Sequence, residues 1–422
     1  MKQLITLLSL FLILSSCNNS QDKKSEPKNK TTSGFTIEET WYTQPVDHDI
    51  PDGETYEEEI IYLYPDSLNR KDVKYILFGL GNEIDSDPSR IEWIWKSYGS
   101  PQDMLVIIAE HRGYGQSQTK GDQTVPSYVT VKQALMDYDR FIQKERKKYP
   151  EAQWVGAGYS YGGALVLQFA HDYPEDLDIV ISSSPPVIWP FYMSQYNEMI
   201  YKNLGEEFVN KMTQHMVNLK PVKVHDENWV DRELLGATLV LMTQTTSFRK
   251  IEPDISKFID SPTDDFMKQL KPMLPEAMTQ MIDARKKEKL TYEEAQTGKF
   301  NWYTWKWQQS YEAGTQFIGP PFPHTKEEIM ADYKASYGMT PPALEKPMWD
   351  LRPLIPAIKV PLIIVNGGAD PWISVGIKPD HNYTNIDYVY NKKEEHVPDL
   401  WYKETGLEVA KLMRKYLEEA ER

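Results

Sequence analysis

The feature that constrains the fold most is a glycine-rich segment, Gly158-Tyr-Ser-Tyr-Gly-Gly163, between a strand-like run and a helical pattern. Trp154–Ala157 before it is typical of a buried strand, and Ala164–His171 after it is typical of a helix. A serine on a tight strand-to-helix turn leaves no room for large neighbours, which explains the flanking glycines. We therefore predict an α/β-hydrolase fold with Ser160 as nucleophile. The alternative is a turn that only connects two elements.

Strand-like and helical patterns alternate on both sides of this segment. The apolar runs are Tyr75–Leu80, Met104–Ala109, Ile179–Ser182, Pro361–Val365 and Ile386–Tyr390. Thr130-Val-Lys-Gln133 resembles a capping box that opens a helix, and Gly406–Ala420 predicts a closing helix. Because strands that alternate with helices pair in parallel, we expect a mostly parallel sheet flanked by helices.

A long central region has a different character. From Trp189 to Met348, strand-like runs disappear and helical patterns separated by proline dominate. The predicted helices are Glu206–Leu219, Arg232–Thr243, Asp264–Met281 and Lys326–Tyr337. We expect residues 189–348 to form a helical cap, inserted into one α/β domain made of residues 35–188 and 349–422.

The N-terminus is typical of a bacterial lipoprotein. Lys2 precedes an apolar run, Leu4–Leu14, that is too short to span a membrane. The run ends in Leu14-Ser-Ser-Cys17, which resembles a lipobox, and Cys17 is the sole cysteine among 422 residues. We expect residues 1–17 to be a signal peptide with Cys17 as the lipidation site, and the polar residues 18–34 to be a flexible tether. The protein would then be exported and anchored to the outer membrane, on its periplasmic or surface face.

Composition excludes several other classes of function. The formal net charge of -15 argues against a nucleic-acid partner, because the 62 Asp and Glu outnumber the 47 Lys and Arg that could displace phosphate counterions. Hydrophobic residues make up 40% and charged residues 26% of the chain, as in an ordinary globular protein. The chain has no H-E-x-x-H motif and no phosphate-binding loop, so we expect no metal and no cofactor.

The catalytic partners of Ser160 can be sought by chain order, which in this fold is serine, acid, histidine. His396 lies in the loop between the last predicted strand and the closing helix, whereas His381 precedes that strand and His324 lies in the cap. Asp370 directly follows a predicted strand and is the preferred acid. Asp380 and Asp387 are alternative acids.

The oxyanion hole requires two backbone N–H donors. One is expected from Tyr161, next to the nucleophile. The second is expected from the loop after Tyr75–Leu80, where Gly81 and Asn82 remain alternatives.

Several segments, taken together, resemble the family of prolyl-specific serine peptidases that includes lysosomal Pro-X carboxypeptidase and dipeptidyl peptidase II (peptidase family S28). A related family of bacterial prolyl aminopeptidases, S37, shares part of the pattern. The segments that carry the resemblance are Gln44–His48, Gly81–Glu83, Glu110–Ser117, Gln133–Asp137, Gly158–Gly163, Ser183–Val187, Trp305–Glu312 and Asn366–Trp372.

The resemblance implies the same triad, with Trp372 and Trp305 lining a pocket for proline. This sequence differs from the family pattern at Ser310, where the family has a cysteine, so we expect the family's disulfide to be absent. An exopeptidase must also bind a terminal charge. Glu83 and Glu312 are candidates for a free amine, and Arg112 is the candidate for a free carboxylate.

The resulting hypothesis is a serine exopeptidase that cleaves short peptides after proline, as a di- or tripeptidyl aminopeptidase. The alternatives are a Pro-X carboxypeptidase, an esterase or lipase on the same fold, and a catalytically inactive binding lipoprotein. For either peptidase, we expect the helical cap to restrict access to the active site to thin, unfolded peptide chains.

Overall fold

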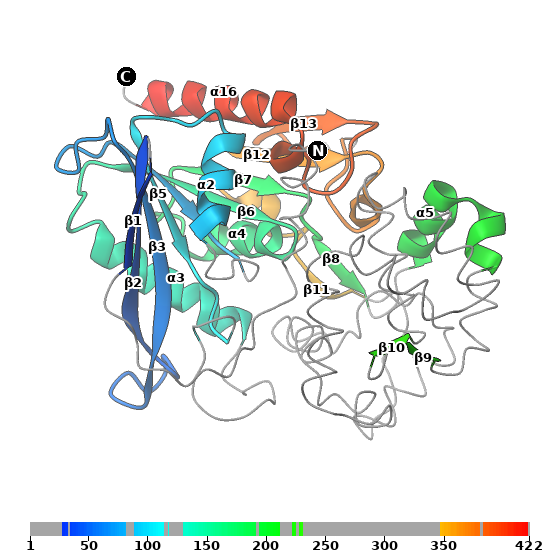
Figure 1. Cartoon of the computed structure of the whole chain (residues 1–422), viewed down its shortest axis with the longest axis horizontal. Helices are drawn as coiled ribbons and strands as arrows, with labels where there is room; N and C mark the ends of the chain where they lie inside the picture. The colour runs from blue at the N-terminus through cyan, green and yellow to red at the C-terminus, as the bar shows by residue number, and fades with distance from the viewer. Residues whose placement is uncertain are drawn as a thin grey trace.

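The computed structural model describes residues 28–32, 34–81, 88–113, 117, 130–190, 194–211, 222–224, 228–230, 347–379 and 383–420. Within these residues the chain forms a nine-stranded sheet in the order β1-β2-β3-β5-β4-β6-β7-β12-β13 (Figure 1). The strands are β1 Lys28–Thr32, β2 Phe35–Pro45, β3 Thr55–Pro65, β4 Tyr75–Gly79, β5 Met104–Ala109, β6 Gln153–Tyr159, β7 Ile179–Ser183, β12 Leu362–Gly367 and β13 Ile386–Asn391.

The six strands from β5 to β13 in this order run parallel to one another, and β5 pairs antiparallel with β3. Every residue of β5 and of β12 is buried, as continuous apolar runs require. All of the strands predicted from apolar runs are present, and the predicted α/β-hydrolase architecture is confirmed. The carboxyl ends of these strands meet at one edge of the sheet, where α/β folds place their ligand sites.

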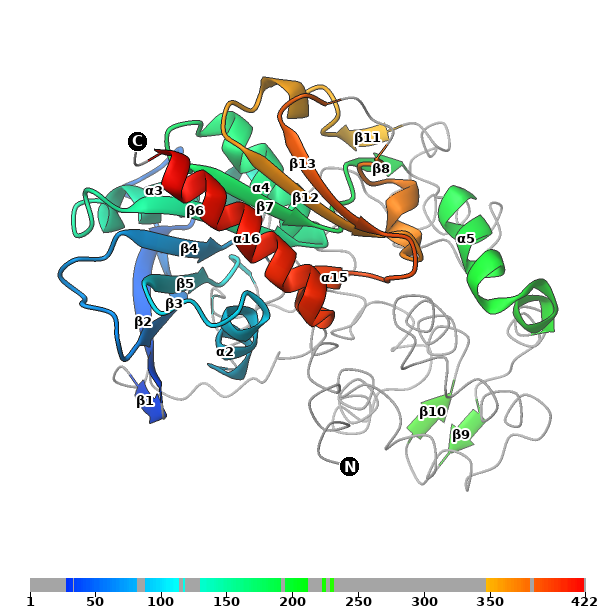
Figure 2. The same cartoon turned by 90° about the horizontal axis from the view of Figure 1, so that it is seen from above.

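Helices cover both faces of the sheet. Helices α3 (Val131–Glu145) and α4 (Tyr161–Asp172) pack on one face. Helices α2 (Pro88–Ser97), α15 (Pro398–Trp401) and α16 (Lys403–Ala420) pack on the other. Figure 2 shows α16 lying across the parallel strands. The sheet is therefore buried on both sides by two apolar layers.

Helix α3 begins as predicted, but the predicted capping box is half formed. The Thr130 hydroxyl accepts a hydrogen bond from the Gln133 N–H at 3.2 Å. The Gln133 side chain does not return to Thr130. It donates to Asp47 Oδ1 at 2.8 Å and accepts from the His48 N–H at 2.9 Å. The side chain thus fastens the loop after β2 to α3.

The N-terminal strands are a departure from the sequence analysis. β2 and β3 form a long antiparallel hairpin that no apolar run predicted. β1 pairs with β2, so residues 28–32 of the expected flexible tether are a strand. The polar residues Lys28-Asn-Lys-Thr-Thr32 can hydrogen-bond through the backbone to an exposed sheet edge without an apolar face.

The central region is described only in part. β8 (Ile188–Pro190) pairs with β11 (Pro347–Asp350), so the two ends of the central region lie side by side. A second short pair, β9 (Val222–Val224) and β10 (Asn228–Val230), corrects the expectation that strands are absent here. Residues 206–211 of the first predicted cap helix are helical. The other three predicted cap helices lie outside the described residues.

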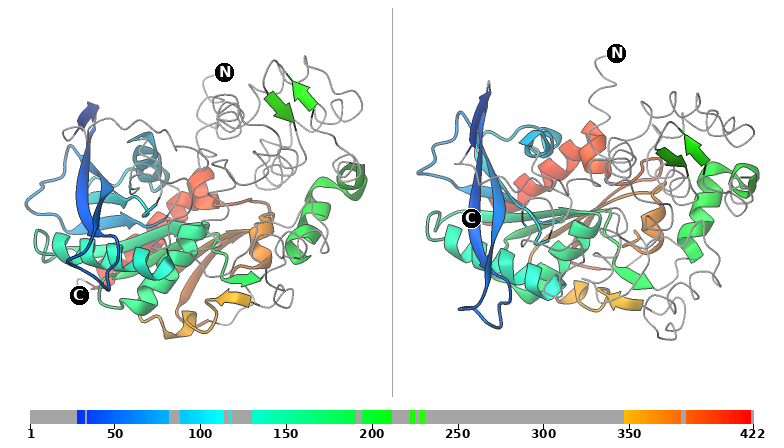
Figure 3. Two further views of the ribbon diagram at one scale, coloured as in Figure 1. Left: turned by 90° about the horizontal axis from the view of Figure 1, so that it is seen from below. Right: turned by 60° about the horizontal axis from the view of Figure 1, so that its bottom comes forward.

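Three further helical elements are present in the described residues. Helix α5 (Ser194–Leu204) lies at the opposite side of the molecule from β1 and β2 (Figure 3). Its Asn203 side chain donates to the Ala369 carbonyl at 2.8 Å, next to the short helix η4 (Pro371–Ser374). Another short helix, η3 (Ile355–Ala357), precedes β12. None of the helices in the described ranges is both long and apolar enough to cross a membrane.

Candidate active site

Ser160 occupies a strained turn between β6 and α4. Its backbone has φ 54° and ψ -124°, an uncommon conformation for a residue other than glycine. A Cβ at Gly158 would overlap the Gly162 carbonyl oxygen, and a Cβ at Gly162 would lie 2.5 Å from the Leu80 carbonyl oxygen. The glycines on both sides of Ser160 are therefore required by close backbone approach, as the sequence analysis predicted.

The loop after β4 lies against the start of α4. Gly81 has φ +145°, and a Cβ there would lie 3.1 Å from the Cα of Gly162. Tyr161, which is buried, is the first residue of α4. Gly81 thus lies against Gly162, which directly follows Tyr161 in the chain. The backbones of Gly81 and Tyr161 are therefore close to each other, as expected for two donors of an oxyanion hole. Asn82, the alternative donor, lies outside the described residues.

Asp370 and His396 are brought together by the ends of β12 and β13. His396 Nδ1 lies 2.8 Å from Asp370 Oδ2, and Asp370 is fully buried. The other carboxylate oxygen, Oδ1, accepts from the Trp372 N–H at 2.9 Å. With the proton on Nδ1, the imidazole keeps Nε2 as the acceptor, which is the tautomer that a general base requires.

The histidine loop is held closely against the acid loop. The Ala369 N–H donates to the Glu394 carbonyl at 2.9 Å. A Cβ at Gly367 would overlap the carbonyl oxygens of Glu394 and Glu395, so only glycine fits there. Glu394 itself is buried and accepts from the Thr405 hydroxyl at 2.7 Å. These contacts limit the freedom of His396 relative to Asp370.

Trp372 lies beside His396. Its ring centroid is 6.5 Å from that of His396, with 40° between the ring planes. The indole is partly buried against the core. This position is consistent with the expected contact to a substrate side chain next to the scissile bond.

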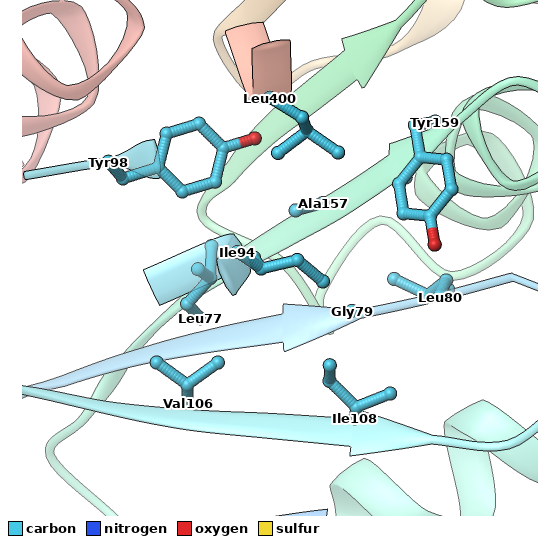
Figure 4. A pocket seen from close by; sticks show the side chains of 11 residues that line it. Leu77, Gly79, Leu80, Ile94, Tyr98, Val106, Ile108, Ala157, Tyr159 and Leu400 are labelled. Carbon is cyan, nitrogen blue, oxygen red and sulfur yellow. The ribbon is translucent and has the colours of Figure 1, made fainter. Parts of the chain in front are cut away.

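An apolar hollow lies on the α2 side of the sheet, next to the turn that carries Ser160 (Figure 4). Tyr159, next to the nucleophile, and Gly79 and Leu80 at the end of β4 contribute to it. Tyr98 and Leu400 close it from α2 and α15.

The structure places Arg112 away from a substrate role. Its guanidinium is fully buried, and Nε and Nη2 bind the two Asp137 oxygens at 2.6 and 2.7 Å. Nη1 and Nη2 also donate to the carbonyls of Val46 and Pro45 at 2.9 and 3.2 Å. A free peptide carboxylate therefore has no access to this cation, which corrects its candidacy.

Asp137 is the centre of a polar cluster that the sequence analysis missed. Besides Arg112, it accepts from the Tyr56 hydroxyl at 2.8 Å, and its Oδ1 lies 2.8 Å from His48 Nε2. Gln44 donates to the buried Glu58 at 2.7 Å and to the Asp137 carbonyl at 3.0 Å. The signal was available, because Gln44–His48 and Gln133–Asp137 are both segments of the family pattern.

Some candidate residues are not brought to the site or cannot be placed. Asp387, an alternative acid, lies within β13 and accepts from the Tyr416 hydroxyl at 2.5 Å. Across the described ranges, no group of three or more His, Cys, Asp or Glu could hold a metal ion. The candidates that lie outside the described residues are Cys17, Glu83, Trp305, Glu312, His324, Asp380 and His381.

Comparison with known proteins finds similarity to one peptidase family. The family model described as serine carboxypeptidase S28 matches residues 44–222. Lysosomal Pro-X carboxypeptidase from Homo sapiens is 32% identical over 144 residues, which cover 31% of this chain and 28% of that protein. The protein of the same name from Mus musculus is 30% identical over 162 residues, 35% of this chain and 32% of that protein.

A further relative is the Caenorhabditis elegans prolyl carboxy peptidase like protein 5. It is 32% identical over 137 residues, which cover 30% of this chain and 27% of that protein. The chain thus spans about a third or less of the length of the curated relatives it matches. The family match includes Ser160 and the Arg112–Asp137 pair, and it ends before Asp370 and His396.

Proposed function

We propose that this chain is a serine peptidase of the S28 family with Ser160 as nucleophile, on the support of the match between residues 44–222 and the serine carboxypeptidase S28 family model. The observation that carries the proposal is the combination of a strained Ser160 and a buried His396–Asp370 pair at the carboxyl edge of one parallel sheet. The family match supports the reaction class, and the geometry supports the proposed roles of the residues.

In the proposed reaction, the Ser160 hydroxyl attacks the carbonyl carbon while His396 Nε2 removes its proton. Asp370 holds the opposite ring nitrogen and stabilises the imidazolium that forms. Backbone N–H groups at Tyr161 and in the loop after β4 bind the developing oxyanion. His396 then returns the proton to the leaving amine, and a water molecule repeats the sequence on the acyl-enzyme.

For the substrate, we propose short peptides cleaved after proline. Trp372 supports this choice, because an indole face beside the base suits the flat, apolar proline ring. Trp305, which lies outside the described residues, is proposed as the second wall of this pocket.

We further propose that the enzyme acts from the amino end of its substrate. The supporting observation is that Arg112, the cation considered for a terminal carboxylate, is buried and bound to Asp137. The remaining candidates for the terminal charge, Glu83 and Glu312, are acidic and suit a free amine. A Pro-X carboxypeptidase is the second candidate, because the curated relatives carry that name.

A panel of substrates tests these proposals on the full-length chain in detergent. It contains unblocked and N-blocked Xaa-Pro and Xaa-Xaa-Pro anilides, a Pro-Xaa peptide with a free carboxylate, and a butyrate ester. Each is also run with Ser160→Ala. We expect turnover of an unblocked prolyl anilide that Ser160→Ala abolishes. Cleavage of the Pro-Xaa peptide alone would establish the carboxypeptidase, and turnover of the ester alone would establish an esterase.

We also propose that a lipid on Cys17 anchors the protein to the outer membrane. The support is the lipobox-like Leu14-Ser-Ser-Cys17 at the end of a short apolar run. Cys17→Ala should release the protein into the soluble fraction of cells. Continued partition of this variant with membranes would contradict the anchor.

A further inference from the structure

We infer that the dipeptide Ser183-Ser184 at the end of β7, together with Asp399, is a clamp that positions Ser160 and His396 relative to each other. None of the three clamp residues belongs to the proposed triad. The inference rests on the proposed function, because it assigns positioning residues for that reaction.

The first half of the clamp holds the nucleophile. The Ser183 carbonyl accepts a hydrogen bond from the Ser160 N–H at 2.8 Å. A Cβ at Gly163 would lie 3.0 Å from the same oxygen, so the first turn of α4 packs closely against the Ser183 carbonyl. The Ser183 hydroxyl donates to Asp399 Oδ1 in a short hydrogen bond. The turn that carries Ser160 is thereby connected to the segment just after His396.

The second half of the clamp holds the base. The Ser184 N–H donates to the Val365 carbonyl of β12 at 2.7 Å, and the Ser184 hydroxyl accepts from the Val397 N–H at 2.9 Å. Val397 directly follows His396. The backbone on the carboxyl side of His396 is thus bound to the residue next to Ser183.

Backbone conformation shows that this arrangement is enforced. Ser160, Ser184 and Val397 have φ of 54°, 48° and 53°, and in the described part of the chain Ser100 is the other non-glycine residue with positive φ. A β-branched side chain such as that of Val397 is a marked outlier in this region. Strained residues persist only where their surroundings fix them. Here three of the four belong to one hydrogen-bonded set around the site.

Asp399 closes the clamp from inside the protein. The residue is 1% exposed, and the Tyr98 hydroxyl donates to its Oδ2 at 2.7 Å. Tyr98 and Leu400 border the apolar hollow (Figure 4), so the carboxylate is held in a site of low polarity where hydrogen bonds are strong. Both of its oxygens therefore have a fixed donor.

The chain offers a matched control for this carboxylate. Asp387 also accepts from a tyrosine, Tyr416, at 2.5 Å, but in the edge strand β13. Tyr98→Phe and Tyr416→Phe each remove one hydroxyl from a tyrosine–aspartate pair. Because the Tyr98–Asp399 pair is buried and the Asp387 side chain is 37% exposed, thermal unfolding is measured for both variants. With both shown folded, loss of positioning would lower activity in Tyr98→Phe alone.

The first measurement is steady-state kinetics of the full-length chain on the best substrate of the panel. Because Ser183 and Asp399 are not proposed to contact substrate, Ser183→Ala and Asp399→Asn should lower kcat by about 100-fold while KM changes by less than about twofold. Tyr98→Phe should lower kcat by a smaller factor. Tyr416→Phe and Asp387→Asn should keep the wild-type kcat.

The second measurement does not require activity. The proton on His396 Nδ1, shared with Asp370, should give a downfield proton NMR signal that is lost in His396→Ala. In Ser183→Ala, which changes no charge, this signal should shift or broaden, and in Tyr416→Phe it should stay. If wild type turned over no substrate, the proposed function would fail, and the signal would still decide the clamp.

The inference is overturned if Ser183→Ala and Asp399→Asn, shown folded by their thermal unfolding, match the two control variants in kcat and in the His396 signal. It is also overturned if their effect falls on KM instead of kcat. Where either variant fails to fold, Tyr98→Phe against Tyr416→Phe decides by the same two readouts.

Discussion

Two histidine–aspartate pairs lie on opposite parts of the sheet and have the same separation. His396 Nδ1 lies 2.8 Å from Asp370, and His48 Nε2 lies 2.8 Å from Asp137. Their surroundings differ. Asp137 also binds the Arg112 guanidinium, which balances its charge inside the protein. Among the described residues, Asp370 has no arginine or lysine partner, so its charge remains available to an imidazolium at His396.

The difference shows that the pair distance does not by itself identify a catalytic pair. The Asp137 carboxylate is saturated by Arg112, Tyr56 and His48, and it joins the β2–β3 hairpin to α3. The Asp370 carboxylate is held by one backbone N–H and directs a histidine at the edge where Ser160 lies. We therefore assign the His48–Asp137 pair to stability and propose the His396–Asp370 pair for catalysis.

The largest contrast should come from removing each histidine. His396→Ala should lower kcat by at least about 10⁴-fold, because the nucleophile loses its base, while thermal stability changes little. His48→Ala should leave kcat within about twofold and lower the free energy of unfolding by about 1 to 3 kcal/mol. Kinetics and chemical denaturation of both variants check this. A large loss of kcat in His48→Ala would break the comparison.

A smaller effect is expected from neutralising the acid of the stability cluster. Asp137→Asn leaves the buried Arg112 without its counter-ion, so the free energy of unfolding should fall by about 3 to 5 kcal/mol. The exposed pair of Asp49 with Lys132, at 3.0 Å, provides the control. Asp49→Asn should change stability by less than about 1 kcal/mol in the same denaturation experiment. If Asp137→Asn lowered the free energy of unfolding as little as Asp49→Asn does, the buried pair would not stabilise the fold.

The smallest effect concerns pH. Burial, and secondarily the charge of Asp137, raise the pKa of Glu58 well above its ordinary value of 4.5. The folded state therefore holds this proton more tightly than the unfolded state does. The associated stability is complete below pH 4.5 and is lost as pH rises toward the folded pKa.

Glu58→Gln should remove this pH dependence. It should raise the free energy of unfolding at pH 8 by at least about 1 kcal/mol and change it little at pH 4. Denaturation at the two pH values measures the effect, with the neighbouring, less buried Glu57→Gln as control. A gain that is equal at both pH values would contradict the assigned cause.

The sequence predicted the parallel part of the sheet because each of its strands is a continuous apolar run. It did not predict the β2–β3 hairpin, since β3 contains Glu57, Glu58 and Glu59 in succession, a pattern typical of an exposed segment. Glu58 and Glu59 are nevertheless buried. Glu58 is bound by Gln44 of β2 and lies beside Asp137 of α3, groups that a local pattern does not contain.

At the candidate site, too, some residues could be identified from the sequence and others could not. Ser160 could be selected from local glycines, and Asp370 and His396 from chain order and their position after strands. Asp399 could not be selected, because its partners Ser183 and Tyr98 lie 216 and 301 residues away in the sequence. Arg112 was misjudged as a substrate ligand because its partner Asp137 lies on a separate element, α3.

The most direct test of the central claim, that His396 activates Ser160, is labelling with a fluorophosphonate. The rate and the labelled residue would be measured by mass spectrometry in wild type, Ser160→Ala, His396→Ala and His48→Ala. The account predicts one label per chain, on Ser160, at a similar rate in wild type and His48→Ala. It also predicts no label on Ser160→Ala and a strongly slowed reaction in His396→Ala. Labelling of another residue, or an undiminished rate in His396→Ala, would contradict it.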